Sequence, residues 1–245
     1  MCEPSSNDRP SNVFPTTRWT LIFELKGGEQ ASKEVAMEEL CQRYWLPVYA
    51  YVRRKCQQRE QAEDLTQGFF EKLISGSQLQ RAEEARGKLR AFMLKCLENY
   101  LNSEWRRSAS QKRGGGFQRI AIDAEHAESL LVSVDLSPTQ AYDQAWALAL
   151  IQSVNEILEQ EYLARGKPEQ FAILRDYLAW NARSRSYADG AAELGISEAA
   201  LKQAVRRLRQ RFGLLLRRQL EHATETETQV EEEIRSLFAA FRRES

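Results

Sequence analysis

The chain has 245 residues, of which 35 are basic and 35 are acidic, so its overall charge gives it no long-range attraction to a polyanion. Charged residues make up 29% of the chain and only 12 residues are glycine. This composition favours a helical protein, and we expect an all-α fold with almost no sheet. No apolar run reaches the roughly 18 residues that a bilayer span needs, and the N-terminus lacks an apolar signal segment. We therefore expect a cytoplasmic protein without membrane contact.

The cysteine and histidine residues lack the spacing of a metal site. The four cysteines never occur as CxxC, and the two histidines have no partners at ligand spacing. We expect no metal and no cofactor, and we interpret the cysteines as structural thiols in a reducing compartment. No nucleophile, base and orienting residue are grouped, so we do not expect an enzyme.

The first helices follow a polar N-terminal extension, residues 1–29, which contains the segment FPTTRW. Two helices are predicted, one over 31–44 and the next from Pro47 to Cys56, because proline favours the first turn of a helix. These two helices can cross. The next helix buries a stripe at helical spacing, namely Ala62, Leu65, Phe69 and Leu73. Its carboxylates, Asp64 among them, stay outside, either for a partner or only to complement the helix dipole.

A longer periodic helix runs from about residue 86 to 107 and ends in an unusual mixture of side chains. Asn99 and Trp105 precede Arg106 and Arg107, which combines an amide, an aromatic ring and cations. Unpaired bases stack on aromatic rings and bond to amides while cations follow the phosphates. This end is therefore a candidate site for single-stranded nucleic acid. The alternative is an ordinary helix terminus with favourable cations.

Gly114–Gly116 opens a weakly periodic stretch that is interpreted as a linker over 114–137. After it, a helix capped by Ser137 and a shorter one after Pro168 are predicted to form the core of a second domain.

Residues 187–220 have the pattern of a helix-turn-helix. Gly195 is expected in the left-handed conformation between the two helices, and Ser197 is expected to cap the second one. That helix buries the stripe Leu201, Val205, Leu208 and Phe212. Residues 197–220 hold seven basic residues against one acidic residue, and such a helix suits the major groove of DNA. The alternative is a surface helix solvated by its arginines.

The C-terminal tail, residues 222–245, is acidic and then amphipathic. Six glutamates and no lysine or arginine occur over 221–233, and VEEEIRSLFAAF places Ile234, Leu237, Phe238 and Phe241 on one side. We predict that this helix folds back on the helix-turn-helix domain and restrains DNA binding. The alternative is a solvated tail whose helix only covers the domain.

Three motifs in this order resemble the bacterial RNA polymerase sigma factors of the extracytoplasmic-function (ECF) type, over about residues 30–220. They are AEDLTQGFFEKL, GKLRAFMLKCLENYL followed by WRR, and YADGAAELGISEAALKQAVRRLRQRF. The resemblance implies a region 2-like domain at 30–113 and a region 4-like helix-turn-helix domain at 138–221, two small helical domains joined by the linker. FPTTRW and QKRGGG resemble the planctomycete-type branch.

The resemblance implies a factor that directs polymerase core to promoters, with three groups of site residues. The polymerase-binding group is Asp64, Leu65, Gln67 and Phe70. The group for recognition and melting of the −10 element is Lys88, Arg90, Asn99, Trp105, Arg106 and Arg107. The group for the −35 element is Ser197, Lys202, Gln203, Arg206, Arg207 and Arg209.

The partners implied by the resemblance are RNA polymerase core and promoter DNA, with an anti-sigma factor or a Ser/Thr kinase as candidate regulators. Thr16, Thr17 and Thr66 are the candidate phosphorylation sites. Two other functions remain open from the sequence. One is a helix-turn-helix DNA-binding regulator that does not join polymerase, and the other is a helical interaction or anti-sigma-like scaffold.

Overall fold

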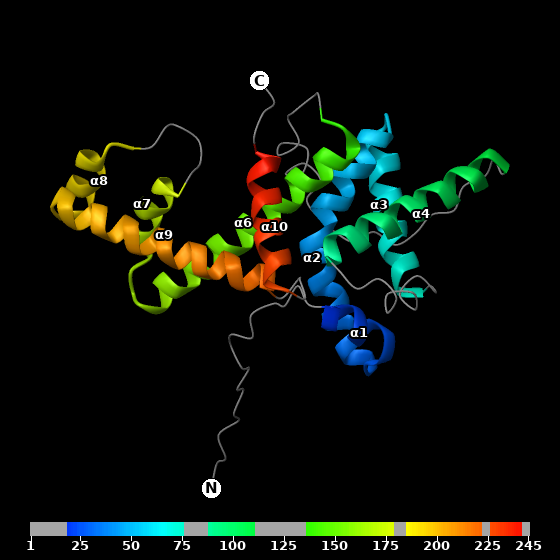
Figure 1. Ribbon diagram of the computed structural model, residues 1–245, viewed down its shortest axis with the longest axis horizontal. Coiled ribbons are helices and arrows are strands. Elements are labelled where there is room, and N and C mark those ends of the chain that lie inside the picture. Colours follow the sequence, from blue (N-terminus) through cyan, green and yellow to red (C-terminus); the bar gives the residue numbers. More distant parts are fainter. Residues whose placement is uncertain (1–18, 76–87, 111–135, 179–184, 222–225, 242–245) are drawn as a thin grey trace, which may run out of the picture.

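The computed structural model describes residues 19–75, 88–110, 136–178, 185–221 and 226–241, and within these ranges every regular element is a helix (Figure 1). The expected all-α fold is confirmed for this part of the chain. In order, the helices are α1 (Trp19–Gly27), α2 (Gln30–Lys55), α3 (Arg59–Ser75), α4 (Leu89–Ser110), α6 (Pro138–Ala164), α7 (Pro168–Leu174), the 3-10 turn η2 (Arg175–Tyr177), α8 (Tyr187–Leu194), α9 (Glu198–Glu221) and α10 (Glu227–Ala240).

Helix α2 continues through Pro47, so the prediction of two crossing helices around this proline is wrong. A proline inside a helix costs about 3 kcal/mol, because it removes one backbone hydrogen bond and crowds the preceding turn. Burial on both sides outweighs this cost. Leu40 and Val48 are both 0% exposed, and each such side chain contributes about 1.5–3 kcal/mol when it leaves water. The continuous α2 contacts α1, α3 and α6 and is the central helix of this end of the molecule.

Helices α3 and α4 complete a bundle with α1 and α2 (Figure 1). Of the predicted stripe on α3, Ala62, Phe69 and Leu73 are fully buried, whereas Leu65 is half-buried. The ring centroids of Phe69 and Tyr100 lie 5.9 Å apart, which brings α4 against α3. Gly68 lies at the same contact, where an added Cβ would overlap with the Tyr100 hydroxyl. A side chain at this position would therefore displace the Tyr100 ring from its place against α3.

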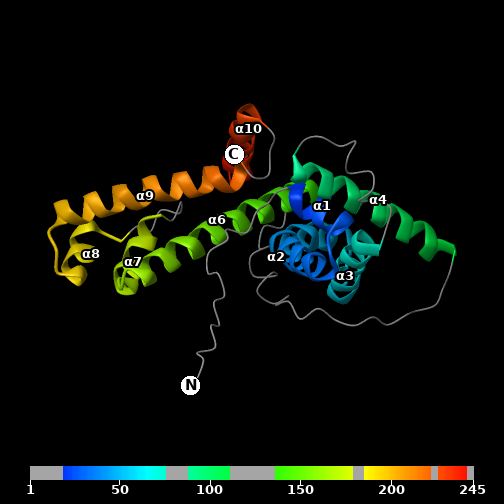
Figure 2. The ribbon, with the colours of Figure 1, turned by 90° about the horizontal axis from the view of Figure 1, so that it is seen from below.

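Helix α6 connects the two ends of the molecule. Its start has the predicted cap: the Ser137 hydroxyl accepts from the Gln140 amide at 3.2 Å, and the Gln140 side chain accepts from the Ser137 amide at 2.8 Å. Figure 2 shows α6 running from the α1–α4 bundle to α7, with α9 beside it. Two long helices, α6 and α9, thus connect the helix-turn-helix end to the bundle.

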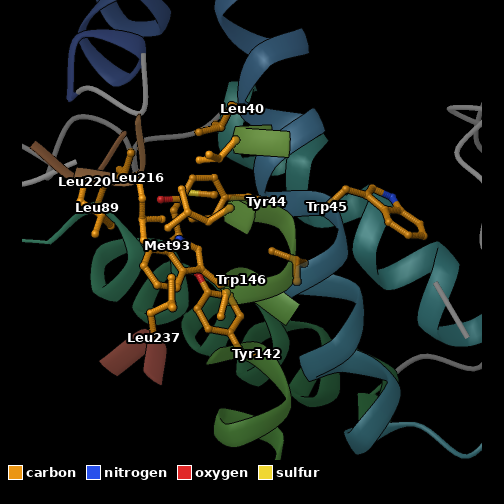
Figure 3. Close-up of a cluster of buried hydrophobic side chains, with 14 of the residues drawn as sticks. Leu40, Tyr44, Trp45, Leu89, Met93, Tyr142, Trp146, Leu216, Leu220 and Leu237 are labelled. Carbon is orange, nitrogen blue, oxygen red and sulfur yellow. The ribbon is translucent and has the colours of Figure 1, made fainter. Parts of the chain in front are cut away.

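A single apolar cluster takes side chains from α2, α4, α6, α9 and α10 (Figure 3). Its members include Leu40, Tyr44, Leu89, Met93, Tyr142, Trp146, Leu216, Leu220 and Leu237. These residues come from both sides of the predicted linker, most of which is outside the described ranges. The division into domains at 30–113 and 138–221 stays a prediction.

No described helix has the length and apolar content that crossing a bilayer requires. Over the same ranges, no group of three or more His, Cys, Asp or Glu side chains is arranged to hold a metal ion. Cys41, Cys56 and Cys96 are buried free thiols. Burial raises the pKa of Cys41 to about 11 and that of Cys96 to about 12, so these side chains behave as core residues.

Candidate nucleic-acid interface

The turn between α8 and α9 has the geometry of a helix-turn-helix. The Ser186 hydroxyl caps α8 by accepting from the Asp189 amide at 3.1 Å. Gly195 ends α8 with a φ of 63°, the left-handed conformation that was predicted. The Ser197 hydroxyl then caps α9, as predicted, by accepting from the Ala200 amide at 3.2 Å. Local hydrogen bonds therefore set the direction in which α9 leaves the turn.

Tyr177, at the end of η2, holds α8 in place. Its hydroxyl donates to the Ser186 carbonyl oxygen at 2.9 Å, and its ring stacks on Tyr187 with centroids 5.0 Å apart. Gly190 faces this tyrosine so closely that an added Cβ would overlap with the hydroxyl and lie 3.1 Å from Leu201 Cδ2. The absence of a side chain at Gly190 thus permits the contact among η2, α8 and α9.

The N-terminal half of α9 presents a polar face to solvent. The exposed side chains there include Lys202, Gln203, Arg206 and Arg207. The predicted apolar stripe, Leu201, Val205, Leu208 and Phe212, is buried. The Lys202 ammonium lies 3.5 Å from a Glu198 carboxylate oxygen and 5.6 Å from the Tyr187 ring centroid. An exposed ion pair contributes at most about 1 kcal/mol, so Lys202 can exchange this partner for a phosphate.

Two residues predicted for the −35 element make internal contacts. Arg209 donates from Nε and Nη2 to the Tyr177 carbonyl oxygen at 3.2 and 2.9 Å, which anchors α9 to the end of η2. The Ser197 hydroxyl is the cap of α9. Both therefore position the helix in this structure, and a DNA contact by either remains a prediction.

The C-terminal half of α4 projects away from the bundle (Figures 1 and 2). Asn99, Trp105, Arg106 and Arg107 are exposed there, with Trp105 at 37%. Arg106 donates to the Asn102 carbonyl oxygen at 3.2 Å, and Arg107 pairs with Glu104 at 3.0 Å. These bonds are within one helix and solvent-exposed, so the group can accept a large ligand without rearranging the core.

Lys88 and Arg90, at the other end of α4, face the protein. The Arg90 guanidinium pairs with Asp143 of α6 and with Glu233 of α10, and it lies 4.7 Å from the Trp146 ring centroid. Burial lowers the pKa of Arg90, but attraction to the two carboxylates outweighs burial and the net change is upward. Neither Asp143 nor Glu233 is among the residues that the sequence pattern marked for function.

Of the polymerase-binding residues on α3, Asp64 is exposed, and Leu65 and Gln67 are half-buried. The Gln67 amide donates to Glu71 at 2.9 Å. Phe70 is 1% exposed and its ring meets that of Phe69 edge-on at 5.2 Å. Phe70 therefore supports the helix from inside, where a partner protein does not reach it.

Thr66 is unsuited to phosphorylation in this fold, which corrects its selection as a candidate site. It is 0% exposed, and its hydroxyl donates to the Ala62 carbonyl oxygen at 2.7 Å. A kinase would have to unfold this part of α3 to reach the hydroxyl. Thr16 and Thr17 lie outside the described residues.

A family model described as ECF sigma factor matches residues 20–220. The comparison with curated proteins found no match, and neither did the comparison with solved structures. The matched range extends from α1 to the C-terminal end of α9, and it includes the helix-turn-helix and both candidate surfaces on α3 and α4. The chain therefore belongs to the ECF sigma factor family, whose members bind RNA polymerase core and promoter DNA to initiate transcription.

Proposed function

We propose that this sigma factor reads the −35 element with the N-terminal half of α9. The observation that carries the proposal is the exposed face of Lys202, Gln203, Arg206 and Arg207 directly after a left-handed turn. A basic helix presented in this way fits the major groove, where arginine and lysine bond to guanine and glutamine bonds to adenine. Arg209 acts by anchoring the helix through the Tyr177 carbonyl.

The −10 element is captured and melted at the C-terminal half of α4. Asn99, Trp105, Arg106 and Arg107 are solvent-exposed there, and this part of α4 projects away from the bundle. A base that has left the duplex gains about 1–3 kcal/mol from stacking on an aromatic ring, which favours the melted strand. Binding energy drives the opening, in keeping with a family that is not enzymatic.

Polymerase core binds the exposed side of α3. Asp64 supplies a charge, and the half-buried Leu65 and Gln67 supply the adjoining surface. Phe70 maintains the helix from beneath. An anti-sigma factor or a Ser/Thr kinase remains a candidate regulator, with Thr16 and Thr17 as the remaining kinase sites. The planctomycete-type branch stays a proposal that rests on the resemblance of FPTTRW and QKRGGG alone, since the family model does not support it.

The test combines purified protein, RNA polymerase core and a promoter library randomised in the −35 element. Alanine at Lys202, Arg206 or Arg207 is expected to relax one promoter position by about 1–3 kcal/mol if the side chain reads a base, and to weaken all sequences alike if it contacts a phosphate. Arg218→Ala, an exposed position near the C-terminal end of the same helix, is the matched control and leaves the preference unchanged.

Unchanged promoter selection in all three variants contradicts the assignment of α9 to the −35 element. Binding of the library by the protein alone, with no transcript formed when core is added, supports the second candidate function, a helix-turn-helix regulator that does not join polymerase. The exposed surface of α3 has no role in a regulator of that kind, and it therefore favours the sigma factor.

A further inference from the structure

Glu233 of α10 is a buried carboxylate held by two cations of another helix. The residue is 1% exposed, and among the described residues the other buried polar side chains are Thr66 at 0% and Gln219 at 3%. Its oxygens lie 3.1 and 3.2 Å from Nε and Nη2 of Arg90, and 3.2 Å from Nζ of Lys88. Lys88 also pairs with Glu232 at 2.9 Å. The start of α4 is thus bonded to α10 through two adjacent glutamates.

The rest of α10 is fixed to α6 and α9. Val230 and Leu237 are 2% and 1% exposed, and both belong to the cluster that also contains Leu216, Leu220 and Trp146. Figure 3 shows Leu237 on the same side of this cluster as Met93 of α4. Helix α10 therefore joins the start of α4 to the two long helices that lead to the helix-turn-helix.

A buried ion pair is a poor source of stability, because removing two charges from water cancels most of their attraction. Apolar residues of similar volume at these positions would hold α10 at least as well. A charged contact differs in being exchangeable, since a phosphate can replace a carboxylate as the partner of an arginine or lysine. The ionic contact between α10 and the start of α4 is therefore suited to an interface that opens when DNA binds.

We propose that α10 is an autoinhibitory clasp, with Glu233 as its latch, which withholds Lys88 and Arg90 from DNA until polymerase or promoter displaces it. The inference rests on the proposed function of α4 at the −10 element, to which the sequence resemblance also assigns Lys88 and Arg90. In the closed form, Glu232 and Glu233 of α10 pair with the two cations, and Asp143 of α6 pairs with Arg90 as well. DNA phosphates and α10 therefore compete for the same donors.

The latch is tested first on the free protein with Glu233→Gln, which keeps the shape of the side chain and removes its charge. Glu232→Gln is the matched control, since its side chain is 47% exposed against 2% for Glu233. Hydrogen exchange over residues 227–240 is expected to accelerate by about tenfold in Glu233→Gln and by less in the control. The reason is that breaking the buried ion pair destabilises the docked helix more than breaking the exposed one.

The same variants are titrated with a labelled duplex that contains an unpaired bubble, at low and high salt. Glu233→Gln is expected to bind about tenfold more tightly than the wild type at low salt, with the gain shrinking as salt rises. Unchanged exchange in α10 overturns the clasp, and so does faster exchange without any gain in affinity for the bubble.

A second measurement needs no variant and guards against a misfolded Glu233→Gln. Exchange over residues 227–240 of the wild-type chain is compared with and without core polymerase, and the clasp predicts lost protection on binding. Retained protection in a complex that transcribes overturns the clasp while the proposed function stands. The opposite outcome is also possible: Glu233→Gln shows faster exchange in α10 and tighter binding of the bubble duplex, but the protein does not bind core or does not transcribe. That outcome overturns the proposed function alone.

Discussion

Replacing Gly190 by alanine is expected to destabilise the helix-turn-helix, although alanine is the better helix former. The added Cβ would overlap with the Tyr177 hydroxyl and lie 3.1 Å from Leu201 Cδ2. Overpacking of this kind costs about 1–3 kcal/mol. Displacing the tyrosine also weakens its hydrogen bond to the Ser186 carbonyl, which contributes about 0.5–1.5 kcal/mol. Alanine returns about 1 kcal/mol in helix propensity, so the expected net loss is about 2 kcal/mol.

Gly213→Ala is the matched control. Gly213 also lies inside a helix, α9, but nothing is within 4 Å of an added Cβ there. Only the propensity gain applies, so this variant is expected to be about 1 kcal/mol more stable than the wild type. The two glycine-to-alanine changes should therefore differ by about 3 kcal/mol, with opposite signs.

A double-mutant cycle with Tyr177→Phe isolates the overlap. The phenylalanine lacks the hydroxyl, so Gly190→Ala should cost less in that background, with a coupling energy of about 1–2 kcal/mol. The free energy of unfolding is measured by denaturant titration, and affinity for a −35 duplex is measured alongside. Equal stability of Gly190→Ala and Gly213→Ala, or additive effects in the cycle, would refute the close approach of α8 to Tyr177.

Three further predictions concern other surfaces. Trp105→Ala should impair open-complex formation by about 1–3 kcal/mol with little change in melting temperature. Lys95→Ala, a control whose side chain is 72% exposed on the same helix, should affect neither. Equal losses in closed and open complexes would contradict base stacking. Asp64→Arg should abolish the pull-down of core polymerase with an unchanged circular dichroism spectrum, and retained binding would remove α3 from the interface. Burial raises the pKa of Cys41 to about 11 and that of Cys96 to about 12, so little thiolate forms near pH 8 and both thiols should be alkylated only as the chain unfolds. Alkylation of the native protein as fast as that of free cysteine would contradict this.

Local features of the structure could be read from the sequence, because short-range chemistry decides them. The spacing of apolar residues identified the buried faces of α3 and α9, and the caps at Ser137 and Ser197 each need only a hydroxyl near the first free amides. Gly195 adopts a conformation that other residues reach only with strain. The family resemblance likewise rested on residues close together along the chain.

Only the tertiary structure decided which of the polar and aromatic candidates make contacts inside the protein. Arg209 looks like its neighbours along α9, but it binds the Tyr177 carbonyl, 32 residues away. Arg90 binds a glutamate 143 residues away. Phe70 is buried although it lies outside the apolar stripe that contains its neighbour Phe69. Pro47 stays within a helix because the surrounding burial outweighs a local penalty. Such contacts depend on which helices meet, and helical periodicity carries no information about that.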